Sequence, residues 1–183
     1  MSKWKVLESS ELFKSGFLRV RTDKCELPDG RVMPRYYVME FPDWVNVVAI
    51  TKEGMALVVD QYRHAAETTF LEIPGGSTDL RQTEDPRLAA ERELLEETGY
   101  QAGRWMDVGF HFPNPATQQN KLHTYIAFEC VKVQEPHLDP YEDLSVRLMP
   151  LKELYERADR GEVTHSLILS SLALARQHLL HLI

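Results

Sequence analysis

Several features that would assign a chain to a specialised class are missing from this sequence. Among its 183 residues there are only two cysteines, Cys25 and Cys130, and they lack C-x-x-C spacing, so we expect two reduced structural thiols. The N-terminus lacks the apolar core of a signal peptide, and no stretch approaches the ~20 apolar residues of a membrane span. We therefore expect a cytoplasmic protein that does not enter a membrane.

Positive charge is also scarce. The chain has 21 lysines and arginines against 28 aspartates and glutamates, which gives a net charge of −7. Such a chain has no general basic surface for nucleic acid, so binding an anionic ligand would require local cations. Hydrophobic residues make up 43% of the chain, and its length suits one domain with a sizeable core and a small N-terminal appendage.

The most informative stretch runs from residue 71 to residue 100, and it is predicted to form a strand, a loop and a helix. Asp85 is a good N-cap, Pro86 suits the first helical position, and Gly99 can adopt the left-handed conformation that ends a helix. Both ends of the helix are therefore specified by local sequence.

This helix is predicted to have an apolar side and an acidic side. The apolar side, expected to face the core, consists of Leu88, Leu94 and Leu95. On the acidic side, Glu93 repels Glu96 and Glu97, three and four residues further on, and each repulsion costs about 0.2–0.5 kcal/mol on an exposed helix. A divalent cation such as Mg²⁺ would offset this repulsion. The alternative is a solvated glutamate-rich surface.

The residues from Arg92 to Tyr100, with Glu84 and Gly76 before them, resemble the signature of the Nudix hydrolases. That signature reads G, five residues, E, seven residues, R-E-aliphatic-x-E-E-x-G-aliphatic. The spacing matches from Glu84 onward, whereas seven residues separate Gly76 from Glu84 and Tyr100 replaces the final aliphatic residue. Neither departure touches the acids that bind metal in this family, and a motif of this length is a specific signal.

The resemblance implies an α/β fold, a Nudix α/β/α sandwich with a mixed sheet and a small N-terminal antiparallel β-sheet. We expect residues 1–43 to form the N-terminal sheet region and residues 44–183 to form the Nudix hydrolase domain. The segments 48–54, 61–63 and 72–76 look like the ADP-sugar pyrophosphatase branch of the family. In that branch the N-terminal sheet is exchanged across a dimer, so the resemblance implies a homodimer.

Residue patterns predict most of the elements of this fold. The turn at 27–30 predicts a hairpin, and Pro34 places the second strand of that hairpin at an edge or a bulge. The other expected strands cover 45–51, 55–63, 106–111, 122–130 and 144–149, and the other expected helices cover 150–158 and 166–182.

The resemblance also implies a metal site. Glu93, Glu96 and Glu97, together with the backbone carbonyl of Gly75, are expected to bind Mg²⁺, with Mn²⁺ as a possible substitute. Arg92 is expected to hold these glutamates by salt bridges rather than to touch substrate. Glu84 is expected to support the loop before the helix.

Related proteins carry their general base in a loop that corresponds to residues 139–143. Of the three acids in this loop, Glu142 has the longest reach and lies just before a strand, so we favour it as the base. A solvated acidic turn is the alternative, in which case a helix glutamate such as Glu96, or metal-bound hydroxide alone, would supply the nucleophile.

Four residues are expected to contact substrate. Arg63 would bind a diphosphate or else form a surface salt bridge, and Trp44 would stack on a base or else pack in the core. Gln118 lies in a loop where related proteins often carry an acid, and Glu72 would make contacts around the metal or the diphosphate.

The resemblance therefore implies hydrolysis of ADP-ribose or a nucleoside diphosphate sugar to a nucleoside monophosphate and a sugar phosphate. One alternative is a Nudix hydrolase that acts on nucleoside triphosphates or dinucleoside polyphosphates. The other is a non-catalytic module that senses ADP-ribose. Loss of signature acids would favour the sensor, and the signature acids are present.

Overall fold

The computed structural model describes residues 3–79 and 84–183, so part of the loop before the signature helix lies outside the described residues. The chain forms two compact units. One consists of Met1–Asp43 and Phe112–Lys121, and the other consists of Trp44–His111 and Leu122–Ile183. The first unit therefore combines the N-terminal strands with the distant segment 112–121.

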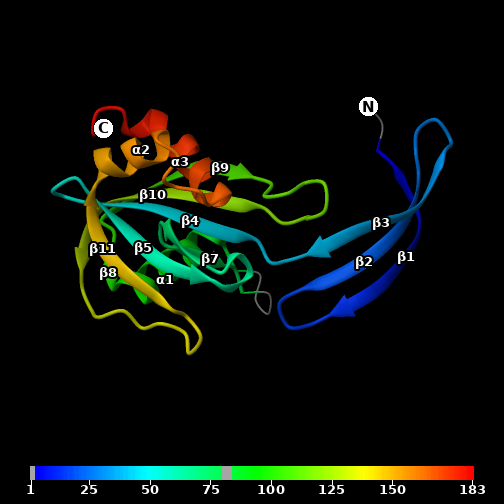
Figure 1. The fold of residues 1–183 in the computed structure, drawn as a ribbon, viewed down its shortest axis with the longest axis horizontal. Helices are drawn as coiled ribbons and strands as arrows, with labels where there is room; N and C mark the ends of the chain where they lie inside the picture. The colour runs from blue at the N-terminus through cyan, green and yellow to red at the C-terminus, as the bar shows by residue number, and fades with distance from the viewer. Residues whose placement is uncertain (1–2, 80–83) are drawn as a thin grey trace. The chain divides into compact units, whose positions relative to one another are not determined.

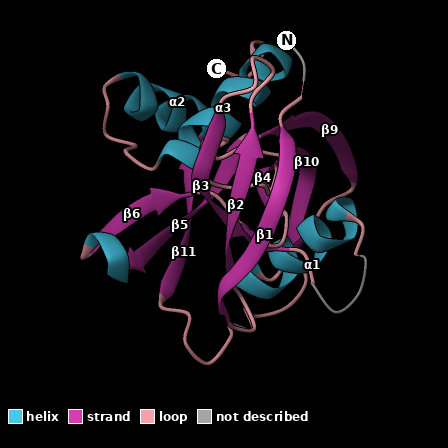
Figure 2. Cartoon of the chain, turned by 90° about the vertical axis from the view of Figure 1, so that its right-hand side faces the viewer, coloured by secondary structure: helices cyan, strands magenta, loops and turns pink. Residues whose placement is uncertain are grey.

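The first unit is a three-stranded antiparallel sheet, seen face-on in Figure 2, with the order β1-β2-β3. Its strands are β1 (Lys5–Lys14), β2 (Arg19–Glu26) and β3 (Val32–Glu40). Gly30 has a φ of 84° in the turn between β2 and β3, a conformation that glycine adopts without strain. The predicted hairpin is confirmed, and Pro34 lies in β3 at the edge of the sheet, as predicted.

The segment 112–121 packs along β3. The N–H of Met39 donates to the carbonyl of Thr117 at 2.7 Å, and the Tyr36 hydroxyl donates to the carbonyl of Ala116 at 2.6 Å. These bonds explain why the segment joins the N-terminal unit although it is distant in sequence. They connect side chains and backbone across about eighty residues, and no local pattern specifies them.

The second unit is built on a mixed sheet with the main order β11-β5-β4-β10-β8 (Figure 1). In addition, β6 pairs with β5, β7 pairs with β4 and β9 pairs with β10, and all pairs are antiparallel except β4 with β10. The strands are β4 (Trp44–Thr51), β5 (Met55–Arg63), β6 (Thr68–Glu72), β7 (Gly75–Ser77), β8 (Tyr100–Gln101), β9 (Arg104–His111), β10 (Leu122–Lys132) and β11 (Leu144–Pro150). The helices are η1 (His64–Ala66), α1 (Pro86–Thr98), α2 (Leu151–Asp159) and α3 (Ser166–Leu179).

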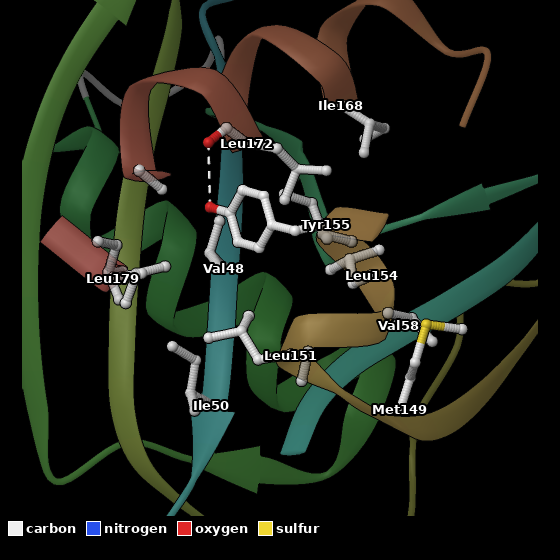
Figure 3. Packing of buried hydrophobic residues seen from close by; sticks show 14 of the residues in the cluster. Val48, Ile50, Val58, Met149, Leu151, Leu154, Tyr155, Ile168, Leu172 and Leu179 are labelled. Carbon is white, nitrogen blue, oxygen red and sulfur yellow. Dashed lines mark hydrogen bonds between the residues drawn. The ribbon is translucent and has the colours of Figure 1, made fainter. Parts of the chain in front are cut away.

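The sheet is covered on both faces, because side chains of β4 alternate between two hydrophobic clusters. Val45 and Val47 pack with α1, whereas Val48 and Ile50 pack with α2 and α3. Figure 3 shows the second cluster, in which the Tyr155 hydroxyl donates to the carbonyl of Leu172 at 3.0 Å. The expected α/β fold, with a mixed sheet and a small antiparallel sheet, is confirmed.

The predicted strands and helices are present, with two local differences. The strand predicted before the signature loop is divided into β6 and β7, with Ile73 and Pro74 between them, and α3 ends at Leu179 rather than at residue 182. Cys25 and Cys130 are buried free thiols, as expected. No helix within residues 3–79 and 84–183 is long and apolar enough to cross a membrane.

The predicted apolar side of α1 is confirmed for Leu94, which is completely buried, but was wrong for Leu88 and Leu95. Leu88 is 58% exposed and Leu95 is only half-buried. The buried residues are instead Ala89, Ala90, Glu93, Leu94, Glu97 and Thr98. The small alanine side chains allow α1 to lie close to β4, and the adjoining glutamates are then buried against β7.

Candidate active site

Local sequence fixes both ends of α1, as predicted. The Asp85 side chain accepts a hydrogen bond from the N–H of Arg87 at 2.7 Å, with Pro86 in the first turn. At the other end, Gly99 has a φ of 75° and donates its N–H to the carbonyl of Leu95 at 2.8 Å. A Cβ at residue 99 would lie 2.1 Å from the carbonyl oxygen of Gln134, so glycine is also required by packing.

Two glycines of β7 lie against the glutamates of α1. The N–H of Gly75 donates to Oε2 of Glu97 at 2.9 Å. A Cβ at Gly76 would lie 2.3 Å from Oε1 of Glu93, so a larger residue there would displace this carboxylate. The Gly-Gly pair therefore makes room for two buried carboxylates beside the strand.

Arg92 connects the start of α1 to the acids around it. Its guanidinium contacts Glu84 at 3.2 Å, Glu93 at 2.9 Å and Glu96 at 3.1 Å, and it donates to the carbonyl of Ser77 at 2.9 Å. Glu84 in turn accepts the N–H of Asp79 at 2.8 Å. The geometry is that of a residue that holds the glutamates and the ends of the loop.

The buried carboxylates are in an environment that disfavours negative charge. Burial raises the pKa of Glu97 well above its usual range, and the charges of Glu93 and Glu142 raise it further. Burial likewise raises the pKa of Glu93, although Arg92 opposes this effect. A cation bound here would favour the ionised forms of both groups. Hard carboxylate oxygens beside a backbone strand are also a donor set that suits a divalent ion.

Within residues 3–79 and 84–183, no three acidic, histidine or cysteine side chains converge as a ready-made metal site. The reason is visible in the hydrogen bonds. Arg92 occupies one oxygen each of Glu93 and Glu96, and the N–H of Gly75 occupies one oxygen of Glu97. Glu93 and Glu97 share a buried face, whereas the Glu96 side chain is 46% exposed.

A second ion pair lies near these acids. Arg63 binds Glu72 through two bonds, at 2.8 Å and 2.6 Å, and Glu72 is almost completely buried. Hydrogen bonding to Glu72 raises the pKa of Arg63, with smaller effects from the charges of Glu97 and Glu142. Arg63 is thus a half-exposed guanidinium held by a buried carboxylate through Nε and one terminal nitrogen.

The loop that carries Glu142 is attached to α1 and β5 through backbone hydrogen bonds. The N–H of His137 donates to the carbonyl of Glu96 at 2.7 Å, and the N–H of Tyr62 donates to the carbonyl of Asp143 at 3.3 Å. The Glu142 side chain accepts the N–H of Asp139 at 2.9 Å. Its charge acts on both Glu93 and Glu97, so the loop brings this carboxylate towards the acids of α1.

Trp44 and Gln118 are the remaining two residues that the sequence predicted to contact substrate. Trp44 is half-buried at the start of β4, where it pairs with Ser77 of β7. Gln118 belongs to the N-terminal unit, where it forms a bridge with Met39 beside β3.

Two further polar residues near this region were missed by the sequence reasoning. Asn46 lies beside Gly75 in the pairing of β4 with β7, and a lone asparagine in an apolar strand was the available signal. His165 caps α3 by accepting the N–H of Leu167 at 3.2 Å, and its ring packs edge-on against Phe70. Nothing in the local sequence indicated a role for this histidine.

The chain matches two protein-family models. Residues 41–169 match the NUDIX domain, and residues 4–38 match the nucleoside diphosphate sugar hydrolase N-terminal domain. The first match covers more than half of the chain, so the chain belongs to the Nudix family, and the resemblance carried by the signature helix is confirmed. Proteins of this family generally use a divalent metal ion.

Its relatives place it within that family. The chain is 30% identical over 160 residues to an ADP-ribose pyrophosphatase of Bacillus subtilis (strain 168), covering 87% of this chain and 85% of that protein. It is 29% identical over 168 residues to an ADP-ribose pyrophosphatase of Mycobacterium tuberculosis (strain ATCC 25618 / H37Rv), covering 91% of this chain and 80% of that protein. The protein is thus a Nudix hydrolase with ADP-ribose pyrophosphatase relatives.

The fold agrees with a solved structure as well. The chain superposes on the crystal structure of an ADP compounds hydrolase with a TM-score of 0.84 at 22% identity, covering 99% of this chain and 96% of that chain. At this identity the likeness establishes the fold alone.

Proposed function

We propose that this protein hydrolyses the diphosphate bond of ADP-ribose or of a nucleoside diphosphate sugar, in a reaction that depends on Mg²⁺. The observation that carries the proposal is the pair of buried carboxylates, Glu93 and Glu97, held against Gly75 and Gly76 of β7. The names of its relatives support ADP-ribose as the first substrate to test. A cytoplasmic location belongs to the same proposal.

In this proposal Glu93, Glu96, Glu97 and the carbonyl of Gly75 hold the metal. A bound divalent ion would neutralise phosphate charge and orient the attacking water for in-line displacement. Arg92 already pairs with Glu93 and Glu96, and these contacts would keep the two side chains close to the position that metal binding requires.

Glu142 would act as general base. It removes a proton from a water molecule while the water oxygen forms a bond to one phosphorus, and the bridging P–O bond breaks. The electron pair of that bond leaves on the bridging oxygen, which becomes part of the second phosphate. The products are a nucleoside monophosphate and a sugar phosphate. If Glu142 does not serve, Glu96 is the alternative base.

The other candidates would bind the substrate. Arg63 would use the N–H groups that Glu72 leaves available to bind a diphosphate oxygen. Glu72 would then orient Arg63. Trp44 would stack on the base, and Gln118 would contribute to substrate choice.

We also propose that the protein is a homodimer in which the N-terminal sheet is exchanged between the two copies. All of β1 is exposed, and three strands with a bare apolar surface are at the lower limit of independent stability. The exposed apolar side chains of the N-terminal unit include Val6, Leu12, Phe13, Phe17 and Val32. Deletion of residues 1–40 should give an insoluble or inactive protein. A fully active monomer, measured by light scattering together with kinetics, would overturn the exchange of sheets.

The substrate assignment is tested by a hydrolysis panel in Mg²⁺ and in excess chelator. The panel contains ADP-ribose, ADP-glucose, GDP-mannose, UDP-glucose, NADH, diadenosine polyphosphates and nucleoside triphosphates, with products separated by ion-exchange chromatography. We expect the highest kcat/KM for a nucleoside diphosphate linked to a sugar. A best substrate without that linkage would overturn the assignment, and binding of ADP-ribose without turnover would indicate a sensor.

A further inference from the structure

Asn46 is a polar residue inside an apolar strand. It is 7% exposed, and its neighbours Val45, Val47 and Val48 in β4 are completely buried. Burying an amide costs free energy unless its polar atoms are paired, so the contacts of this side chain need to be accounted for.

One end of the Asn46 amide is held by α3. Its Nδ2 donates to Oγ of Ser171 at 3.0 Å and to the carbonyl of Leu167 at 3.3 Å. Ser171 also bonds to Oγ1 of Thr124 in β10 at 3.0 Å, and both hydroxyl residues are completely buried. These bonds fix the orientation of the amide, because Nδ2 must face α3 and Oδ1 must face the other way.

The other end of the amide lies against Gly75. A Cβ added at Gly75 would be 2.5 Å from Oδ1 of Asn46, so the oxygen packs directly on this glycine. Within residues 3–79 and 84–183, no hydrogen bond donor reaches Oδ1 of Asn46. Asn46 and Gly75 are also opposite each other in the pairing of β4 with β7.

Gly75 is therefore constrained by two elements on opposite faces of the sheet. Glu97 of α1 accepts its N–H at 2.9 Å, and Oδ1 of Asn46, whose side chain is held by α3, packs against the glycine from the other face. Glycine has no Cβ, so its φ and ψ angles are less restricted than those of any other residue. Its peptide groups take a defined orientation only if neighbouring groups impose one.

We propose that Asn46 is a positioning residue, which fixes the backbone of Gly75 and through it the Glu97 carboxylate and the Gly75 carbonyl for a divalent cation. The consequence for metal binding rests on the function proposed above, whereas the effect on Gly75 does not. Groups that orient metal ligands without touching the metal typically change metal affinity about 10–100-fold when they are removed.

The experiment compares wild-type protein with Asn46→Ala, with Thr124→Ala as a matched control. Thr124→Ala removes a buried hydroxyl from the same network and leaves both Nδ2 bonds of Asn46 in place. The first measurement is hydrogen exchange of the Gly75 amide in metal-free protein by NMR, with the Gly99 amide as an internal reference. Calorimetric titration with Mn²⁺ and the kcat and KM for ADP-ribose follow.

In Asn46→Ala we expect exchange of the Gly75 amide to accelerate about tenfold relative to Gly99, and Mn²⁺ affinity to fall about 10–100-fold. Turnover at limiting metal should fall with it and recover at high Mn²⁺ concentration. Thr124→Ala should lose thermal stability, whereas its Gly75 amide exchange rate and its Mn²⁺ affinity should be unchanged. If Asn46→Ala does not fold, Ser171→Ala, which removes one of the two bonds to Nδ2, should give a smaller change in the same direction.

A Gly75 amide whose exchange stays within twofold of wild type in the folded variant would overturn the proposal, whatever happens to stability. If the Gly75 amide of Asn46→Ala exchanges faster but the Mn²⁺ affinity is unchanged, the proposed effect of Asn46 on metal binding would be overturned. If the wild-type protein binds no Mn²⁺ and hydrolyses no member of the panel, the proposed function fails, and the exchange measurement still decides whether Asn46 positions Gly75.

Discussion

The two faces of the large sheet are covered by helices of opposite character. On one face, α3 contributes large apolar side chains such as Leu172 and Leu179, each no more than 2% exposed, to a continuous hydrophobic cluster. On the other face, α1 contributes two alanines and one leucine, and it buries Glu93 and Glu97 beside them. Each helix buries one of its sides, but only α1 places carboxylates inside the protein.

This difference indicates a division of tasks. Burial of apolar side chains under α3 stabilises the fold at about 25 cal/mol per Å². Burial of carboxylates under α1 opposes folding in the absence of a cation, as the raised pKa values of Glu93 and Glu97 indicate. Substitutions of the buried glutamates under α1 should therefore change activity with little loss of stability, and substitutions of buried apolar side chains under α3 should do the reverse.

The largest effect on activity is expected from Glu97→Gln. The amide keeps the size of the side chain and can still accept the N–H of Gly75, but it removes a negative charge from the metal site. We expect kcat to fall about 10³-fold or more, beyond the 10–100-fold loss typical of groups that only orient metal ligands. Steady-state kinetics across a range of Mg²⁺ concentrations measures this. If Glu97→Gln keeps wild-type activity at limiting Mg²⁺, Glu97 is not a metal ligand.

Glu142→Gln tests the loop that faces α1. If Glu142 is the general base, kcat should fall roughly 10²–10⁴-fold while KM and metal affinity change little. Asp139→Asn is a suitable control, because it alters the same loop and keeps Glu142. A loss of less than about tenfold in Glu142→Gln would make Glu96 the better candidate for the base.

Leu172→Ala sharpens the comparison from the α3 side. Leu172 is 2% exposed, and truncation of a buried leucine to alanine typically costs about 2–5 kcal/mol of the free energy of unfolding. Urea denaturation should record that loss, while kcat measured at 10 °C, where the variant is folded, stays within about twofold of wild type. A large fall in kcat of the folded variant would mean that the two faces are not separable.

The smallest effect concerns the pH dependence of stability in metal-free protein. The pKa of Glu97 is higher in the folded state than its unfolded value of about 4.3, so the folded protein binds this proton more tightly. The stability gained from the proton is complete below the unfolded pKa and is lost as pH rises through the folded pKa.

Glu97→Gln lacks this proton equilibrium, and its stability relative to wild type should therefore increase as pH rises. Each unit between the folded and unfolded pKa values corresponds to about 1.4 kcal/mol. Urea denaturation in chelator at pH 5 and pH 8 measures the difference between the two proteins. A difference that is the same at both pH values would show that the burial of Glu97 does not disfavour its charge.

The features that sequence predicted well are specified by neighbouring residues. Asp85, Pro86 and Gly99 set the ends of α1 through contacts within one turn, and continuous apolar runs indicate β4 and β5. The signature acids could be identified for the same reason, since their spacing on one helix is a local property. These features required no knowledge of which element packs on which.

The features that sequence did not predict depend on contacts between distant segments. Leu88 and Leu95 were predicted to be buried and are not, whereas Glu93 and Glu97 are buried where the glycines of β7 leave room for them. Arg63 bonds to Glu72 although it lies opposite Thr68 in the pairing of β5 with β6, so strand pairing alone would not predict this ion pair. The position of the segment 112–121 depends likewise on bonds to β3.

The function proposed for this protein requires the acidic side of α1 to bind a divalent cation. Its most direct test is a Mn²⁺ titration followed by electron paramagnetic resonance, with wild-type protein, Glu97→Gln and Leu172→Ala at 10 °C. We expect wild type and Leu172→Ala to bind Mn²⁺ with the same affinity, and we expect Glu97→Gln to bind it much more weakly. Equal binding by Glu97→Gln and wild type would contradict this expectation.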